Sequence, residues 1–352
     1  MNELTYLITG LKFGGAEKQL LLLAKEAIST GYKVTVIVLL HETDLEKEFR
    51  SIGADVINLG LNKINFLIIL NRLRMIIKSK NVKLLHSHMF HAVMIARLVK
   101  IFSRDLKVIS SAHCIDEGKG LRGKLYKITQ HLSDYDTHVS NTALNEFLKS
   151  GAYVENNSIA VENAIEFKTA LNEDRKDFLS VGRLEYEKGF DVLIEAFKLV
   201  VNKYPEVKLT IIGQGSYKDE LITLIQDLNL NKNIEILNPT VDVFSFYSRS
   251  KYYISSSRTE SFGMTICEAI AMRCITLVPE LPVIKEILSS NYPVDYIHDG
   301  TVESLTEKII QCIENYDDNE KFIGDISDYV YNKFKVEKVF STWVKLYARV
   351  MK

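Results

Sequence analysis

Short apolar runs alternate with helical patterns along the whole chain. The first run covers Leu4–Thr9, a loop follows over Gly10–Gly15, and apolar residues then recur at helical spacing over Ala16–Thr30. The next run, Lys33–Leu40, is apolar at almost every position, which is typical of a parallel strand with helices on both faces. This β-α-β order predicts an α/β fold built from doubly wound parallel sheets.

The pattern occurs in two series, separated by a polar, Asn-rich stretch over residues 155–175. Further strands of the first series are expected at Asp55–Leu59, Leu84–His86, Val108–Ser111 and Thr137–Val139. Strands of the second series are expected at Phe178–Gly182, Lys208–Ile212, Ile234–Leu237, Tyr252–Ser256 and Ile275–Val278. A chain of 352 residues with 47% hydrophobic content is long enough to bury two cores.

We therefore expect one Rossmann-like domain over residues 1–168, a second over residues 169–335, and a final helix over residues 336–352. That helix packs on its own domain or crosses back to the first. Two such domains predict a cleft between them, with ligands at the carboxyl ends of the strands. Chemistry is therefore expected in the loops that follow strands.

Basic residues are concentrated in one segment, although the whole chain carries a net charge of −1. Between Leu61 and His131 there are fourteen Lys and Arg and three acidic residues, a balance of +11, so the remainder carries −12. The near-neutral total argues against a nucleic-acid-binding protein, whereas the basic segment suggests an anionic surface or substrate. A solvated, lysine-rich face is the alternative.

Cysteine spacing and hydropathy bear on the compartment. Four scattered cysteines form no C-x-x-C pair, which argues against a zinc site or a disulfide framework and fits a reducing compartment: Cys114, Cys267, Cys274 and Cys312. The longest apolar runs, such as Val34–Leu40, are too short to span a bilayer. We expect a cytoplasmic protein with no cofactor and no metal.

Two loops after expected strands carry glycines or cations. Gly14 and Gly15 precede the first helix, where paired glycines let the backbone approach a ligand and the helix N-terminus favours an anion. Their spacing is not G-x-G-x-x-G, and a plain tight turn is the alternative. Arg183 and Lys188 flank a strand-to-helix junction and can bracket a diphosphate. The alternative is that they are surface cations next to acidic neighbours.

The segment Arg258–Glu268 carries the strongest pattern. Glu260 lies in the loop after an expected strand, and Glu268 lies on the helix that follows. That helix is expected to open with Phe262, Gly263, Met264 and Thr265. Its free N–H groups can bind a phosphate or a hydroxyl, and a carboxylate can accept from both hydroxyls of a ribose. The alternative makes Glu260 a helix cap and Glu268 an ordinary surface residue.

Histidines cluster after two strands. His86, His88 and His91 lie near one strand end, and no nearby carboxylate completes a metal site with them. His113 directly ends the following strand, so it is expected to line the cleft as a hydrogen-bond donor.

On these residues the whole chain resembles the family 4 retaining glycosyltransferases. The most specific feature is the E-x7-E pattern of Glu260 and Glu268. It is supported, in chain order, by Gly14-Gly15, His113, Asn163-Ala164-Ile165-Glu166, Val181-Gly182-Arg183 and Lys188-Gly189. The stretch His113–Gly118 looks like members that build bacterial surface polysaccharides. The resemblance implies a GT-B fold of two facing Rossmann-like domains.

The same resemblance implies a role for each matched residue. Arg183 and Lys188 would hold the donor diphosphate, and Glu268 the nucleotide ribose. Glu260 and His113 would contact the transferred sugar. Backbone N–H groups would come from Phe262, Gly263, Met264 and Thr265, and room for donor phosphate and acceptor from Gly14 and Gly15. Glu260, His113, Arg183 and Lys188 are thereby the candidate catalytic residues.

The chain departs from the family pattern at two places. Asn163-Ala164-Ile165-Glu166 stands where Asn-Gly-Ile-Asp is usual, and Ser261 replaces the common glycine after the first Glu. The second change is expected to affect sugar selectivity, so the donor sugar stays open between hexose and N-acetylhexosamine.

The chemistry agrees with these roles. A departing nucleoside diphosphate gathers negative charge on its β-phosphate, and cations with helix N–H groups stabilise that charge without a metal. No D-x-D sequence lies at a strand end. We expect a metal-independent, retaining transferase with a UDP-sugar donor. The expected acceptor is an oligosaccharide or a lipid-linked sugar, in the synthesis of a surface polysaccharide such as O-antigen or capsule.

Three other functions fit parts of the same pattern. A GT-B sugar-nucleotide epimerase shares the two domains but needs acid and base groups that the sequence does not identify. An NAD-dependent oxidoreductase is disfavoured by the missing G-x-G-x-x-G, although Glu42 is suitably placed after the second strand. A non-catalytic sugar-nucleotide-binding protein is disfavoured because both cations and both glutamates are retained.

The segment Ile64–Ile77 raises the question of a membrane. Its apolar residues recur at helical spacing with Arg72 and Arg74 among them, as in a helix lying on a membrane surface. Peripheral binding to the inner leaflet is one expectation. A buried helix that covers the first sheet is the other.

Overall fold

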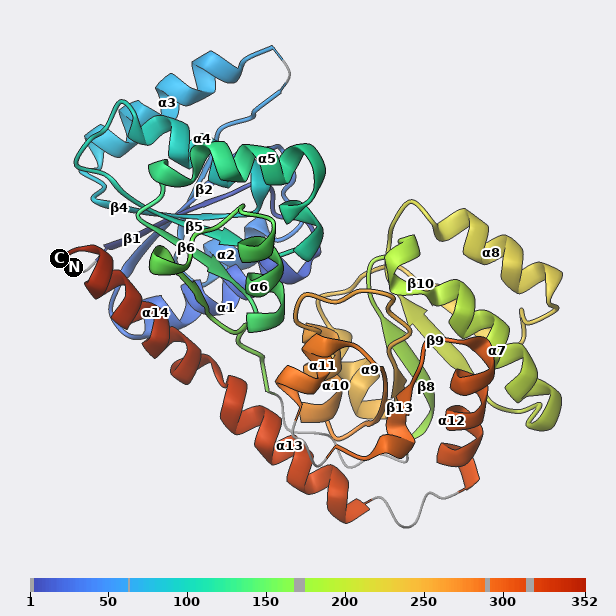
Figure 1. The fold of residues 1–352 in the computed structure, drawn as a ribbon. Coiled ribbons are helices and arrows are strands. Elements are labelled where there is room, and N and C mark those ends of the chain that lie inside the picture. The colour runs from blue at the N-terminus through green and yellow to red at the C-terminus, as the bar shows by residue number, and fades with distance from the viewer. Residues whose placement is uncertain (1–2, 63, 168–174, 289–291, 315–319) are drawn as a thin grey trace. The chain divides into compact units, whose positions relative to one another are not determined.

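The computed structural model describes residues 3–62, 64–167, 175–288, 292–314 and 320–352 (Figure 1). Its strands are β1 Glu3–Ile8, β2 Lys33–Val38, β3 Asp55–Asn58, β4 Leu84–His88, β5 Lys107–Ala112, β6 Tyr135–His138, β7 Ser158–Ala160, β8 Lys176–Val181, β9 Leu209–Ile212, β10 Ile234–Leu237, β11 Ser250–Ile254, β12 Ile275–Pro279 and β13 Ile297–His298. Its α-helices are α1 Gly15–Ser29, α2 Glu46–Ser51, α3 Phe66–Ser79, α4 Phe90–Lys100, α5 Gly120–Thr129, α6 Asn141–Lys149, α7 Phe190–Lys203, α8 Lys218–Asp227, α9 Val243–Arg249, α10 Met264–Ala271, α11 Pro282–Ile287, α12 Val302–Glu314, α13 Glu320–Phe334 and α14 Val336–Val350.

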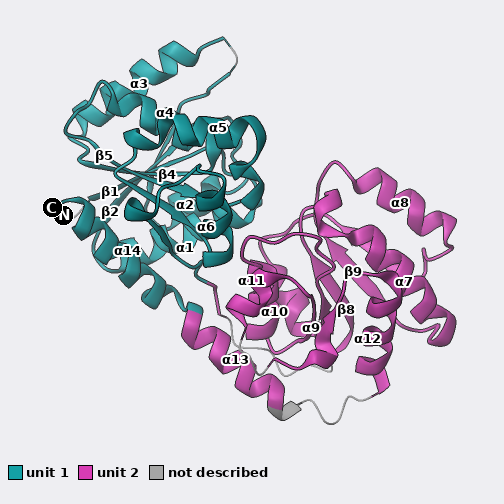
Figure 2. Cartoon of the chain, in the orientation of Figure 1, with its two compact units in different colours: residues 1–164, 334–352 teal, residues 165–333 magenta. Residues whose placement is uncertain are grey.

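The chain divides into two compact units (Figure 2). Unit 1 comprises residues 1–164 and 334–352, and unit 2 comprises residues 165–333. The division expected after residue 168 thus lies between Ala164 and Ile165, and residues 168–174 fall outside the described residues.

Unit 1 contains a seven-stranded parallel sheet in the order β3-β2-β1-β4-β5-β6-β7. Helices α1 and α14 cover one face, and α3 and α4 cover the other (Figure 1). The central strands β1, β4 and β5 are buried almost throughout, as expected for a sheet with helices on both sides. β4 continues two residues beyond the expected end, so His88 is its last residue.

The C-terminal helix α14 belongs to unit 1. Its buried face includes Trp343 and Tyr347, which join the core formed by α1, β1 and β2. The hydroxyl of Tyr347 lies 2.9 Å from Nδ1 of His86 in β4. Of the two positions expected for this helix, the structure has the one on the first half of the chain.

Unit 2 contains a six-stranded parallel sheet in the order β10-β9-β8-β11-β12-β13. Its core is apolar along each central strand and includes Phe178 and Leu179 in β8 and Ile254 in β11. Helix α7 packs against α8 and α12 on one side of the sheet, and α9 and α10 lie on the other (Figure 1). Both units are therefore doubly wound α/β layers.

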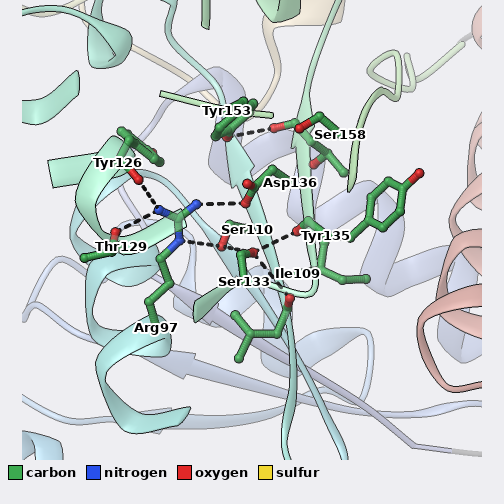
Figure 3. A network of polar contacts seen from close by, with 12 residues as sticks. Arg97, Ile109, Ser110, Tyr126, Thr129, Ser133, Tyr135, Asp136, Tyr153 and Ser158 are labelled. Atoms are coloured by element: carbon green, nitrogen blue, oxygen red, sulfur yellow. Dashed lines mark hydrogen bonds and ion pairs between the residues drawn. The ribbon is translucent and has the colours of Figure 1, made fainter. Parts of the chain in front are cut away.

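A fully buried ion pair links helix α4 to strand β6 in unit 1 (Figure 3). Arg97 of α4 and Asp136 of β6 have no exposed side-chain surface, and their charged atoms lie 2.8 Å apart. The guanidinium also donates to the carbonyl of Tyr126 and to the hydroxyls of Ser110 and Thr129. Because the hydrogen bonds of this cation reach α5, β5 and β6, one side chain of α4 ties the four elements together.

Helix α3 combines the two expectations for the segment Ile64–Ile77: one side is buried against the sheet, and another exposes apolar residues. Ile69, Leu73 and Ile77 are buried in the core beneath α3 and α4. Ile64, Phe66, Leu67, Ile68 and Met75 are exposed. The helix covers the sheet with one side and presents apolar residues to solvent with another.

Candidate active site

The strand orders place one crevice in each unit. In unit 1 the order reverses between β1 and β4, and in unit 2 it reverses between β8 and β11. Loops that follow such neighbouring strands diverge to opposite faces, and ligands of doubly wound sheets bind where they separate. The candidate residues after β8 and β11 therefore share one edge of the unit 2 sheet.

The loop after β8 carries both predicted phosphate cations. Arg183 follows β8, is exposed, and has no side-chain hydrogen bond or ion pair to any other described residue. Lys188 ends a short 3-10 turn over Tyr186–Lys188, just before α7. Gly189 caps α7 with φ 65°, and a Cβ there would lie 2.1 Å from the carbonyl oxygen of Ser256. Only glycine fits this junction, because both the backbone angle and the space exclude a side chain.

Lys188 and Glu260 meet across the two loops. The Lys188 ammonium forms an ion pair with Oε1 of Glu260, and the two side chains are 21% and 9% exposed. The hydroxyl of Ser257 donates to the same carboxylate oxygen at 2.9 Å. Glu260 is thus held by a cation from another loop, which the helix-cap interpretation did not require.

An arginine clamp holds these two loops together. Arg258 makes a bidentate contact with Asp191 at 2.8 and 2.7 Å and donates to the carbonyl of Tyr186 at 2.6 Å. Its guanidinium lies 4.0 Å from the Tyr186 ring centroid, and its backbone N–H donates to Glu187. A planar fork is well suited to this task, because it fixes the direction as well as the distance of its partner.

Helix α10 begins two residues beyond the expected opening at Phe262. Gly263 is its N-cap with φ 91°, so the helix starts at Met264, while Phe262 precedes it and is buried. The first N–H groups of a helix have no partner within it, so Met264 and Thr265 present theirs at the carboxyl edge of the sheet. The partial positive charge at this end favours an anion.

Glu268 is buried rather than on the surface. It is 2% exposed, and the hydroxyl of the buried Tyr247 lies 3.3 Å from its Oε2 and 3.4 Å from the Thr265 carbonyl. The interpretation of Glu268 as an ordinary surface residue is therefore wrong. Burying a carboxylate costs free energy unless hydrogen bonds or a cation compensate for the lost hydration.

The glycine loop of unit 1 is closely packed by acidic side chains. Gly14 caps α1, Gly15 is its first residue, and a Cβ on Gly14 would lie 2.4 Å from Oε2 of Glu17. Glu42, the residue considered for a ribose, pairs with Lys12 at 2.7 Å and closes over Gly10. The Glu42 carboxylate is thus paired with a lysine, whereas an NAD-dependent oxidoreductase would need it to bind the ribose.

His113 directly follows β5, as expected, and contacts a second histidine. Its Nε2 lies 3.0 Å from Nδ1 of His88 at the end of β4. Burial lowers the pKa of His113 to about 4 and holds the pKa of His88 well below its usual value, so both rings are neutral at pH 7. Glu117, in the turn after His113, accepts from the Tyr126 hydroxyl at 2.9 Å, and burial raises its pKa to about 7.

The structure brings the unit 2 candidates to one sheet edge and places Gly14 and His113 after β1 and β5 of unit 1, with β4 between these strands. Two contributors were missed in the sequence, the Arg258–Asp191 clamp and Tyr247, and the contact of His88 with His113 was not foreseen. Arg258 and His88 lie inside patterns already singled out, but their partners are 67 and 25 residues away and give no local signal.

Some cations of the basic segment are paired with acidic side chains from outside it. Arg97 pairs with Asp136, and Lys100 and Lys107 pair with Asp134, which lies beyond the segment. The balance of +11 therefore overstates the charge on this surface. Among the described residues no helix is long and apolar enough to cross a bilayer, and no three His, Cys, Asp or Glu side chains gather as metal ligands.

Two family profiles match the chain, one in each half. Residues 13–161 match "Glycosyltransferase Family 4", and residues 161–326 match "Glycosyl transferases group 1".

Curated relatives and solved structures are similar to the chain. A Staphylococcus aureus poly(ribitol-phosphate) alpha-N-acetylglucosaminyltransferase is 26% identical over 58% of this chain and 41% of its own length. An Erwinia amylovora amylovoran biosynthesis glycosyltransferase, AmsD, is 30% identical over 50% and 49%. The chain thus spans about half the length of these relatives. The Anabaena protein HepE, solved with UDP and glucose, superposes with a TM-score of 0.86 at 15% identity and covers 99% of each chain.

The two profiles together span residues 13–326, and each unit has the parallel, doubly wound sheet of a GT-B half. The chain belongs to the family 4 glycosyltransferases of GT-B fold.

Proposed function

We propose that the chain transfers a hexose or N-acetylhexosamine from a UDP-sugar, with retention of configuration and without a metal, to a glycan or lipid-linked acceptor. The product belongs to a bacterial surface polysaccharide. One observation carries the proposal: Lys188 and Glu260 converge from two loops beside the start of α10, with Glu268 buried on that helix. The polysaccharide relatives and the UDP bound to HepE support it.

Each side chain has a task in this proposal. Arg183 and Lys188 hold the diphosphate together with the N–H groups of Met264 and Thr265. Glu268 accepts from the ribose hydroxyls, and Glu260 from hydroxyls of the sugar. Unit 2 thereby binds the donor, while unit 1, with His113 and the Gly14-Gly15 loop, receives the acceptor and touches the sugar.

In this proposal the acceptor oxygen attacks the sugar directly, and no protein nucleophile takes part. The bond from the sugar C1 to the β-phosphate oxygen breaks, and the acceptor oxygen forms its bond to C1 on the same face. The acceptor proton passes to the departing phosphate oxygen. Negative charge builds on the β-phosphate during this step, and the cations are placed to stabilise it more than they stabilise the bound donor.

Nucleotide binding tests the donor. UDP at about 100 times its Kd is expected to stabilise the chain by about 2.7 kcal/mol, because it binds only the folded state. Thermal shift with UDP, GDP and ADP measures this, with Glu268→Gln as the control that loses a ribose acceptor. Stabilisation by GDP alone contradicts a UDP donor. A hydrolysis assay with UDP-sugars then compares hexoses, and a chelator added to it is expected to leave the rate unchanged.

We assign the acceptor side to a lipid surface through α3. Ile64 just before this helix and Phe66, Leu67 and Ile68 in its first turn are exposed and lie outside the core that its other face joins. Arg72, Arg74 and Lys78 are exposed on the same helix and complement anionic headgroups. This combination of apolar and basic residues is that of an interfacial helix, and it suits a lipid-linked acceptor at the inner membrane face.

Vesicle sedimentation tests this surface. Binding to anionic vesicles is expected at low salt, with each nearby cation contributing about 1 kcal/mol. Leu67→Asp should lower the partition coefficient about tenfold or more, because a buried Leu contributes about 1.5–3 kcal/mol. Val294→Asp is the matched control, since Val294 in unit 2 is 74% exposed and Leu67 is 75% exposed. If wild-type protein ignores anionic vesicles at low salt, the membrane proposal is wrong and the transferase assignment stands.

A further inference from the structure

One described side chain, that of His88, hydrogen-bonds the imidazole of His113. His88 is 1% exposed, and the ring centroids of the two histidines lie 5.2 Å apart. The remaining ring nitrogens, Nε2 of His88 and Nδ1 of His113, are shielded from solvent and have no hydrogen-bond partner among the described residues. Nε2 of His113 is therefore hydrogen-bonded within the protein, whereas its Nδ1 is not hydrogen-bonded to any described residue.

This contact couples the tautomers of the two rings. A neutral imidazole carries one proton, so one of its nitrogens donates and the other accepts. If His88 donates from Nδ1, His113 must carry its own proton on Nδ1. If His113 donates from Nε2, its Nδ1 is an acceptor. The tautomers of the two rings are thus set together, and the shared hydrogen bond determines whether the free nitrogen of His113 is a donor or an acceptor.

The His88 ring is itself held in place. It packs against His86, with ring centroids 4.0 Å apart and an interplanar angle of 38°. His86 is fixed by Tyr347 at 2.9 Å and by Ser111 at 2.7 Å. His138 of β6 also lies near His113, and burial lowers its pKa to about 3. No charged group among these neighbours competes for His113.

The backbone beside His88 is in a rarely occupied conformation. Met89 has φ 71° and ψ 156°, a backbone region that residues other than glycine seldom adopt. Its N–H donates to the carbonyl of Ser111 in β5 at 3.0 Å. This turn joins the ends of β4 and β5, and it sets His88 opposite His113.

We propose that His88 is a positioning residue for His113: it holds the ring orientation that His113 presents to the transferred sugar and couples the tautomer of His113 to its own. The inference rests on the proposed function, in which His113 contacts that sugar. His88 itself touches no substrate and acts through the hydrogen bond between the two rings.

Three variants of the full chain separate this role from general packing. His88→Leu removes the hydrogen bond, and His88→Asn restores a polar atom near the position of Nδ1. Tyr347→Phe removes a hydroxyl from the same cluster without touching His113. Ring-nitrogen NMR of His113 reports its tautomer and titration, and UDP-sugar hydrolysis reports kcat and KM.

His88→Leu is expected to alter the His113 ring signals and to lower kcat about tenfold, the loss of one hydrogen bond, with little change in the KM for the donor. His88→Asn should recover most of both, and Tyr347→Phe should affect neither. Unchanged His113 signals in His88→Leu overturn the proposal, as does an equal loss of kcat in Tyr347→Phe. Altered signals together with wild-type activity of His113→Ala would instead overturn the assigned role of His113 and leave the coupling in place.

Discussion

Arg183→Ala is expected to lower kcat/KM for transfer by about 30-fold to 1,000-fold, which corresponds to about 2–4 kcal/mol of transition-state stabilisation. The guanidinium is exposed and has no described partner, so its loss removes a charge from the donor site without breaking an internal contact. The melting temperature should therefore stay the same. Initial rates with a UDP-sugar and thermal unfolding, measured on one preparation, check both statements.

Lys188→Ala is expected to lower kcat/KM by a similar factor and also to destabilise unit 2. It leaves the Glu260 carboxylate, whose side chain is 9% exposed, with the Ser257 hydroxyl in place of a cation. The double variant Lys188→Ala/Glu260→Ala should regain stability but not activity. The matched control is Lys285→Ala, which removes an exposed ion pair with Glu280 in the same unit and should change neither quantity.

The two glutamates are expected to separate binding from turnover. Glu268→Ala should mainly weaken nucleotide binding, because its carboxylate is buried on α10 where the ribose is proposed to lie. Glu260→Ala should chiefly lower turnover, because this residue faces the phosphate cation. Wild-type rates in both variants with the true acceptor would show that the site has been placed wrongly.

The fold followed from local patterns in the sequence because parallel strands are apolar at nearly every position. The runs Lys33–Leu40 and Ile234–Leu237 predict strands from their own residues, without knowledge of the neighbouring strands with which they pair. Strand ends were less exact: the apolar run continues to Leu40, whereas β2 ends at Val38. The polar residue His88 was expected outside β4, yet pairing with Ser111 keeps it in the sheet.

The site was predictable only where its residues lie close together in the sequence. Glu260 and Glu268 form a pattern within one loop and helix, whereas the bond between Lys188 and Glu260 spans 72 residues. The balance of +11 overstated the unpaired charge for the same reason, because Asp134 and Asp136, which lie beyond the segment, form ion pairs with Arg97, Lys100 and Lys107. Ion pairing is a tertiary property, and a count along the chain does not contain it.

Arg97→Met is expected to destabilise unit 1 by about 3–5 kcal/mol, because it leaves the Asp136 carboxylate buried without its cation. Asp136 has no exposed surface, and the carbonyl of Tyr126 and the hydroxyl of Thr129 also lose their donor (Figure 3). Chemical denaturation followed by the fluorescence of Trp343 measures the loss. Trp343 is the one tryptophan of the chain and is buried in unit 1, so its signal reports on that unit.

Two further variants decide whether the loss comes from the unpaired charge. Arg97→Met/Asp136→Leu should recover most of the stability, because a buried pair replaced by apolar side chains is often neutral or better. Lys80→Ala breaks an exposed pair with Asp55 at 2.9 Å in the same unit and should cost at most about 1 kcal/mol. A loss in Arg97→Met as small as in Lys80→Ala would mean that water or a neighbour compensates Asp136. The network in Figure 3 would then not be what holds α4, α5 and β6 together.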